Sequence, residues 1–184
     1  MGNFGGKLVA VSPDTSTFQP KFDEFEKLIN KNTKAVIVNN PNNPTGVVYS
    51  EETIKKLAKI MEDKQKELGI EIFLIADEPY RELAYDGVEV PYLTKYYDNT
   101  IVGYSYSKSL SLPGERIGYL VIPDEVVDAE DMKAAASGPA GTYTQSSGTS
   151  LAAAQTSGIA ALLFEWAIIR GNEPFFSGNS VKII

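Results

Sequence analysis

Two basic residues, Lys108 and Arg116, lie in the segment "VGYSYSKSLSLPGERIGY", which begins at Val102. A lysine taken alone is usually a solvated surface residue. A lysine near other charged groups on a packed edge of the fold can instead act as an amine nucleophile toward an aldehyde. The chemistry of this segment therefore depends on the side chains that the fold brings to Lys108.

Polar residues that could surround this lysine follow two other apolar runs. "NNPNNPTG", which contains Asn43, follows "KAVIV", and "DEPY", from Asp77 to Tyr80, follows "IEIFLIA". A carboxylate such as Asp77 at the end of a buried strand could hold the proton of a pyridinium nitrogen. Tyr80 and Asn43 could donate hydrogen bonds to a phenolate oxygen. Taken alone, "NNPNNPTG" is also typical of a simple turn, because Asn, Pro and Gly favour turns.

The remaining polar residues of the set suit a phosphate group. Ser105 lies three positions before the lysine, and Arg116 can bind a phosphate through two parallel hydrogen bonds. An aldehyde, a pyridine nitrogen, a phenolate and a phosphate are together the functional groups of pyridoxal phosphate. These residue types therefore predict a pyridoxal phosphate site, provided that the fold brings them together.

Short apolar runs predict the strands that would do so. The runs are apolar on both faces, which is typical of a covered sheet, and they begin at Lys7, Lys34, Ile70, Thr100 and Arg116. Helical patterns lie between them, in "FDEFEKLIN" and in the stretch from Ser50, a good N-cap, to Gly69. The alternation predicts an α/β fold of three layers, with a mainly parallel sheet and helices on both faces.

The last strand, Arg116–Ile122, is predicted to be antiparallel. Nine residues, from Ser107 to Glu115, separate it from the preceding run, and a parallel crossover usually needs about a dozen or more. Ligands bind at the carboxyl ends of parallel strands. One edge of the sheet should therefore carry the polar set and the start of the antiparallel strand: Asn43, Asp77, Tyr80, Ser105, Lys108 and Arg116.

Composition limits the other classes of function. The net charge of -7 argues against nucleic acid as the main partner, because phosphate binding needs an excess of Lys and Arg. The chain has no histidine and no cysteine, which excludes Ser-His-Asp and Cys-His catalysis and His-ligated metal sites within it, so no metal is predicted. The sequence does not open on a signal-peptide pattern, which predicts a cytoplasmic protein that is not held in a membrane.

The motifs "NPNNPTG", "DEPY" and "SYSKSLSLPGERIGY" resemble the three central motifs of class I/II aminotransferases, the fold type I enzymes that depend on pyridoxal phosphate. The resemblance covers about residues 3–132, the central part of the family's large domain, and includes the antiparallel strand. It implies transamination between an amino acid and a 2-oxo acid. It also allows a homodimer, because enzymes of this family are usually dimers with sites at the interface.

The resemblance implies a role for each residue of the set. Lys108 would form an aldimine with the cofactor and move protons, and would act in catalysis together with Tyr80 and Asp77. Asp77 would pair with the pyridine nitrogen, and Tyr80 and Asn43 with the phenolate oxygen. The rest of the cofactor-binding set would be Ser105 and Arg116, which bind the phosphate, and Ser107.

The family pattern is incomplete in this sequence. We expect the turn that donates backbone N–H groups to the phosphate, and the aromatic residue that stacks on the cofactor, to lie upstream of Met1. The small domain, with its arginine for the substrate carboxylate, is also missing from the pattern. These departures predict a fragment or chimera that attaches the cofactor with little or no turnover. The alternative is a non-catalytic folded or designed scaffold built from family fragments.

The C-terminal segment, about residues 138–184, resembles another family. "SSGTSLAAAQTSGIAALL" is similar to the nucleophile region of subtilisin-like serine proteases, with Ser150 in the position of the nucleophile. Without a histidine base, this serine is expected to be inactive. The sequence thus predicts an aminotransferase-like part, 1–133, and a subtilase-like tail, 134–184, whose helix at about 150–170 packs on the same core.

Overall fold

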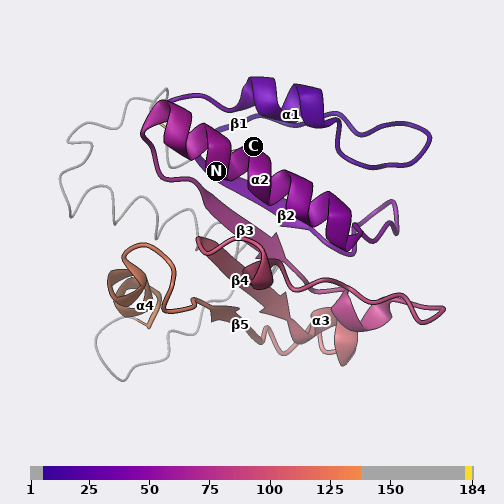
Figure 1. Ribbon diagram of the computed structural model, residues 1–184. Coiled ribbons are helices and arrows are strands. Elements are labelled where there is room, and N and C mark those ends of the chain that lie inside the picture. The colour runs from indigo at the N-terminus through magenta and orange to yellow at the C-terminus, as the bar shows by residue number, and fades with distance from the viewer. Residues whose placement is uncertain (1–5, 138–180, 184) are drawn as a thin grey trace.

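One mixed sheet organises the chain. The computed structural model describes residues 6–137 and 181–183, and in them the strands follow the order β1-β6-β2-β3-β4-β5 (Figure 1). Neighbouring strands are parallel except β4 and β5, which are antiparallel. The strands are β1 (Gly6–Leu8), β2 (Thr33–Asn39), β3 (Phe73–Asp77), β4 (Thr100–Ser105), β5 (Gly118–Val121) and β6 (Val181–Ile183). The predicted mainly parallel sheet with an antiparallel last strand is confirmed.

Helices cover both faces of this sheet, as the sequence predicts. The helices are α1 (Phe22–Leu28), α2 (Glu51–Leu68), α3 (Tyr106–Ser109) and α4 (Ala129–Ser137), with the 3-10 helices η2 (Arg81–Leu83) and η3 (Leu93–Lys95). Figure 1 shows α1 beside α2, and the two helices contact each other. Helix α4 packs against the opposite face through Ala129 and Met132, which share a buried cluster with Phe73 and Ile75.

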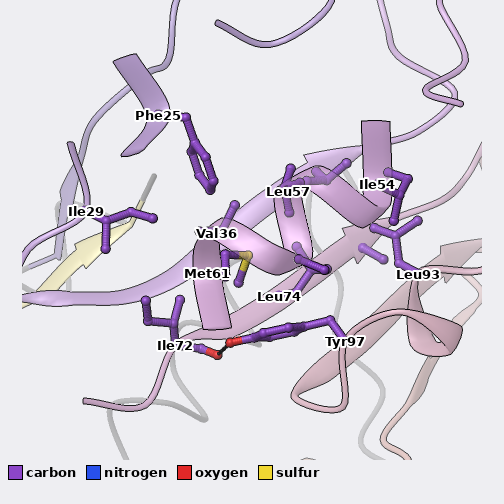
Figure 2. Close-up of a cluster of buried hydrophobic side chains, with 13 residues drawn as sticks. Phe25, Ile29, Val36, Ile54, Leu57, Met61, Ile72, Leu74, Leu93 and Tyr97 are labelled. Carbon is purple, nitrogen blue, oxygen red and sulfur yellow. Dashed lines mark hydrogen bonds between the residues drawn. The ribbon is translucent and has the colours of Figure 1, made fainter. Parts of the chain in front are cut away.

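Within residues 6–137 and 181–183, the alternation of side chains along the central strands gives two hydrophobic cores. Val36 and Leu74 face the core under α1 and α2, which Figure 2 shows together with Met61 of α2. At the edge of this core, the buried Tyr97 hydroxyl donates a hydrogen bond to the carbonyl oxygen of Ile72 at 2.6 Å. The neighbouring residues Ala35, Phe73, Ile75 and Ile101 point the other way and form the core under α4.

The ends of α2 follow from local chemistry in its sequence. Ser50 Oγ accepts a hydrogen bond from the Thr53 N–H at 3.2 Å, which satisfies a donor of the first turn. At the other end, Gly69 adopts φ 63° and ψ 42°, and its N–H donates to the Gln65 carbonyl oxygen at 2.9 Å. This left-handed conformation favours glycine, so the helix ends where the sequence predicts.

Replacing Gly69 with alanine should lower the free energy of unfolding by about 1 kcal/mol, because a Cβ disfavours the left-handed conformation. A Cβ at Gly69 would meet no atom within 4 Å, so the cost is conformational rather than steric. Urea unfolding measures the change. Gly114→Ala is the matched control, since its Cβ would also meet open space but its φ is not positive. Equal stability of the two variants would contradict the account of this helix end.

The outer strands depart from the prediction that every run is covered on both faces. In β1, Leu8 is 63% exposed, and in β5, Tyr119 is 44% and Val121 is 42% exposed. The prediction is wrong for these strands because, within the described residues, each lies at an edge of the sheet beyond the layers that bury β2, β3 and β4. Strand β6, between β1 and β2, was not predicted.

Part of the predicted tail lies outside the described residues. This applies to the helix expected at about 150–170 and to Ser150. In the part of the chain that the structure describes, no helix has the length and apolarity needed to cross a membrane.

Candidate active site at the carboxyl ends of the strands

Asp77 is the last residue of β3 and lies at the carboxyl end of the parallel strands. It pairs in register with Asn39 of β2 on one side and with Gly103 of β4 on the other. Asn39 Nδ2 donates a hydrogen bond to Asp77 Oδ2 at 3.1 Å. Burial raises the pKa of the Asp77 carboxyl to about 6, since desolvation outweighs the hydrogen bond from Asn39, and the nearby Glu78 adds to the rise. This carboxyl can therefore gain or lose a proton near neutral pH.

Asn43 and Tyr80 are joined by a direct hydrogen bond, although 37 positions separate them. Asn43 Nδ2 donates to the Tyr80 hydroxyl oxygen at 2.8 Å. The Asn43 backbone N–H is held by Asn39 Oδ1 at 2.7 Å, and Gly46 closes the following turn with φ 72°. Because the Tyr80 hydroxyl accepts the bond from Asn43, it keeps its own hydrogen for donation to another acceptor.

Lys108 lies in α3, the short helix that follows β4. Its side chain is exposed, and its Nζ lies 5.9 Å from the centre of the Tyr80 ring. Lys108 therefore lies next to the Asn43–Tyr80 pair, at the same edge of the sheet as Asp77. The exposure differs from the packed edge predicted for this amine, and Lys108 lies on a helix of four residues that contacts η2.

Ser105 and Ser107 lie where β4 ends, and Arg116 lies two residues before β5 begins. Buried Ser105 caps α3: its Oγ accepts from the Ser107 N–H at 3.2 Å and lies 2.9 Å from Ser107 Oγ. Ser105 also pairs in register with Gly118 of β5, two residues after Arg116. Arg116 adopts a left-handed φ of 56°, and its Nη1 donates to the Pro113 carbonyl oxygen at 3.0 Å. Its Nε and Nη2 are buried and make no hydrogen bond to any of the described residues.

All the residues of the predicted set that precede residue 137 thus lie at one end of the sheet. Direct contacts join Asn43 to Tyr80 and Ser105 to Ser107, and Lys108 stands over the Tyr80 ring. Asn39, which is not among the predicted site residues, contacts both Asp77 and the Asn43 backbone. The sequence could have indicated Asn39, because it directly follows one predicted apolar run as Asp77 directly follows the next.

A buried ion pair lies next to Asp77, in the turn that follows β3. Glu78 is 3% exposed, and its Oε2 lies 2.7 Å from Arg81 Nε. The Arg81 guanidinium also donates to the carbonyl oxygens of Val90 and Pro91 at 2.7 and 3.0 Å, and it lies 3.9 Å from the centre of the Tyr92 ring. These contacts tie the turn that carries Tyr80 to the segment before η3.

Comparison with known proteins gives the family. The profile of the family described as aminotransferase class I and II matches residues 4–162 of this chain, so the chain belongs to that family. Aminotransferases of this family depend on pyridoxal phosphate. The match extends beyond residue 133 into the segment with the protease-like pattern, and the subtilase resemblance of that segment stays a prediction.

Individual relatives agree with the profile. An aspartate aminotransferase from Pyrococcus horikoshii is 35% identical over 115 residues, which are 62% of this chain and 28% of that protein. A probable N-acetyl-LL-diaminopimelate aminotransferase from Bacillus subtilis is 37% identical over 122 residues, 66% of this chain and 30% of that protein. The chain thus spans about a third of the length of the curated relatives it matches.

A solved structure shows the same fold. The crystal structure of an amino transferase from Eubacterium rectale superposes with a TM-score of 0.67 and 47% sequence identity. The match covers 95% of this chain and 36% of that chain.

Proposed function

We propose that this chain forms the central part of a pyridoxal-phosphate-dependent aminotransferase and that its cofactor site lies at the carboxyl ends of β2, β3 and β4. The observation that carries the proposal is the meeting of Asp77, the Asn43–Tyr80 pair and Lys108 at one edge of the sheet. Family membership supports transamination between an amino acid and a 2-oxo acid as the reaction, with a homodimer as the assembly. The relatives are named for different substrates, so their names do not favour one amino acid.

The chemistry of the residues fits the cofactor. Asp77 offers a carboxylate whose ionised form lacks a cationic partner in either neighbouring strand, and a pyridinium nitrogen would supply one. Tyr80 and Asn43 offer donors for a phenolate oxygen. Two buried guanidinium nitrogens of Arg116 have no partner within the part of the chain that the structure describes. Unpaired buried donors on a charged group are costly, and a phosphate would satisfy them.

Each residue would have a defined task during the reaction. The bound cofactor supplies an electron sink for charge that develops on the substrate α-carbon. Lys108 Nζ would be the amine that holds the cofactor, and it would take up or release a proton during the reaction. Asp77 keeps a proton at the pyridine nitrogen by pairing with the cationic form. Tyr80 and Asn43 orient the ring by donating hydrogen bonds to one oxygen, and Ser105, Ser107 and Arg116 hold the phosphate.

The role of Arg116 predicts a specific loss. Arg116→Ala should weaken the binding of pyridoxal phosphate by about 10- to 100-fold, because hydrogen bonds to charged groups contribute roughly 1.5–3 kcal/mol. It should barely change the binding of pyridoxal, which has no phosphate. Fluorescence titration with both ligands measures the two constants. Lys66→Ala, which removes an exposed positive charge from α2, is the control. An equal loss for both ligands would contradict a phosphate role for Arg116.

The proposal as a whole is tested with the purified chain and pyridoxal phosphate. We expect a saturable visible absorbance band, and a change in that band when an amino acid such as L-aspartate or L-glutamate is added. Binding without the response to amino acids would limit the function to cofactor binding. If the chain binds no more pyridoxal phosphate than its Arg116→Ala and Asp77→Asn variants do, the proposed function is wrong and the scaffold alternative is favoured.

A further inference from the structure

Asn39 uses both ends of its side-chain amide at the candidate site. Its Nδ2 donates to Asp77 Oδ2 and to the Asp77 carbonyl oxygen, each at 3.1 Å. Its Oδ1 accepts from the Asn43 backbone N–H at 2.7 Å. One half-buried side chain therefore joins the carboxylate at the end of β3 to the loop that carries the partner of Tyr80.

The residues beside Asp77 on the neighbouring strands carry no charge that could pair with its carboxylate. The strands on its two sides present Asn39 and Gly103, neither of which is charged. The residue that follows it in the chain, Glu78, is acidic and is paired with Arg81. Within the described residues, Asn39 is the side chain that donates a hydrogen bond to the Asp77 carboxylate. This hydrogen bond fixes the orientation of the carboxylate.

We propose that Asn39 is a positioning residue of the cofactor site, which sets the Asp77 carboxylate and the Asn43–Tyr80 pair in their relative places. The inference rests on the proposed function, because it names the residue that aligns two parts of that site. Asn39 acts through Asp77 and Asn43 and is not required to touch the cofactor. A side chain that could only donate, or only accept, would hold one of the two parts and release the other.

Two substitutions separate the two contacts. Asn39→Asp keeps an acceptor for the Asn43 N–H, loses the donor to Asp77 and places a like charge beside it. Asn39→Ala removes both contacts. Asn42→Ala is the matched control: Asn42 belongs to the same loop and accepts from Thr45 Oγ1 at 2.8 Å, but it makes no hydrogen bond to Asp77.

The first measurement uses the cofactor-free chain. Carbon-13 NMR follows the titration of the Asp77 carboxyl, and hydrogen exchange follows the Asn43 amide. Loss of the Asn39 donor should raise the titration midpoint of Asp77 by about one pH unit in Asn39→Ala, since this hydrogen bond favours the ionised form. Exchange of the Asn43 amide should be faster in Asn39→Ala and unchanged in Asn39→Asp. If Asn39 only stabilised the fold, Asn43 amide exchange would not differ between Asn39→Ala and Asn39→Asp in this way.

The second measurement is the dissociation constant for pyridoxal phosphate. We expect it to rise about tenfold or more in both Asn39 variants, and to stay within about twofold of the wild-type value in Asn42→Ala. Wild-type affinity in Asn39→Asp would overturn the inference while leaving the proposed function intact. If the wild-type chain binds no cofactor, the proposed function fails, and an unchanged Asp77 midpoint in Asn39→Ala then overturns the inference as well.

Discussion

Asp77→Asn should make the cofactor-free chain more stable at neutral pH and at the same time weaken its binding of pyridoxal phosphate about 100-fold. Both effects have one cause. Burial raises the pKa of the Asp77 carboxyl from 3.8 to about 6, so ionising it in the folded chain costs free energy. A shift of about two units corresponds to roughly 2–3 kcal/mol, or about 100-fold in an equilibrium. A bound pyridinium would pair with the ionised carboxylate and reverse that cost.

The sign of the pH dependence follows from the direction of the shift. The folded chain binds the Asp77 proton more tightly than the unfolded chain does. The contribution of this group to stability is therefore complete below about pH 4 and is lost as the pH rises through about 6. Asparagine cannot ionise, and its amide oxygen can still accept the hydrogen bond from Asn39. The gain in stability should thus appear at pH 7 to 8 and vanish near pH 4.

Urea unfolding at several pH values, without cofactor, measures this gain. Asp98→Asn is a suitable control, because Asp98 is an exposed aspartate next to β4. An Asp77→Asn variant that is less stable than the wild type at pH 7.5 would show that the carboxylate is not held at a cost. A variant that binds pyridoxal phosphate as tightly as the wild type would show that Asp77 does not partner the pyridine nitrogen.

Lys108→Ala should abolish the visible absorbance band of the bound cofactor and the reducible covalent bond to the chain. The reason is that Lys108 is the amine beside the Asn43–Tyr80 pair. Its side chain is exposed, so the free energy of unfolding should change by no more than about 0.5 kcal/mol. Weaker, non-covalent binding of pyridoxal phosphate should remain, because the phosphate and pyridine contacts are unchanged.

Lys95→Ala provides a close match for this variant. Lys95 is also exposed and also lies over a tyrosine ring, with its Nζ 5.5 Å from the centre of the Tyr92 ring. It lies in η3, which precedes β4, whereas Lys108 follows that strand. Absorbance spectra of the two variants with pyridoxal phosphate make the comparison. Retention of the full band in Lys108→Ala would assign the attachment to another lysine.

The parallel direction of the central strands, and the edge of the sheet at which the polar residues lie, could be predicted from the sequence because they follow from local patterns and from the lengths of the connections. Apolar runs and helix caps fix where elements begin and end, and Ser50 and Gly69 do so for α2. Parallel strands then bring Asp77 and Lys108 to one edge, whatever the details of packing. The antiparallel β5 followed from loop length alone.

Other features depend on contacts between distant segments. The pairing of β6 with β1 and β2 joins residues near the two ends of the sequence, and three residues carry too little pattern to indicate it. The role of Asn39 depends on the register between β2 and β3, which periodicity does not determine. The exposure of Lys108 and of Tyr119 depends on which layers cover the edge of the sheet.

The most direct test of the central claim is the location of the covalently attached cofactor in the wild-type chain. The chain is incubated with pyridoxal phosphate and reduced with borohydride, and the labelled peptide is identified by mass. We expect one label per chain, on Lys108, and a lower yield of label when excess inorganic phosphate competes for Arg116. Label spread over the surface lysines, or confined to a lysine other than Lys108, would contradict the proposed site.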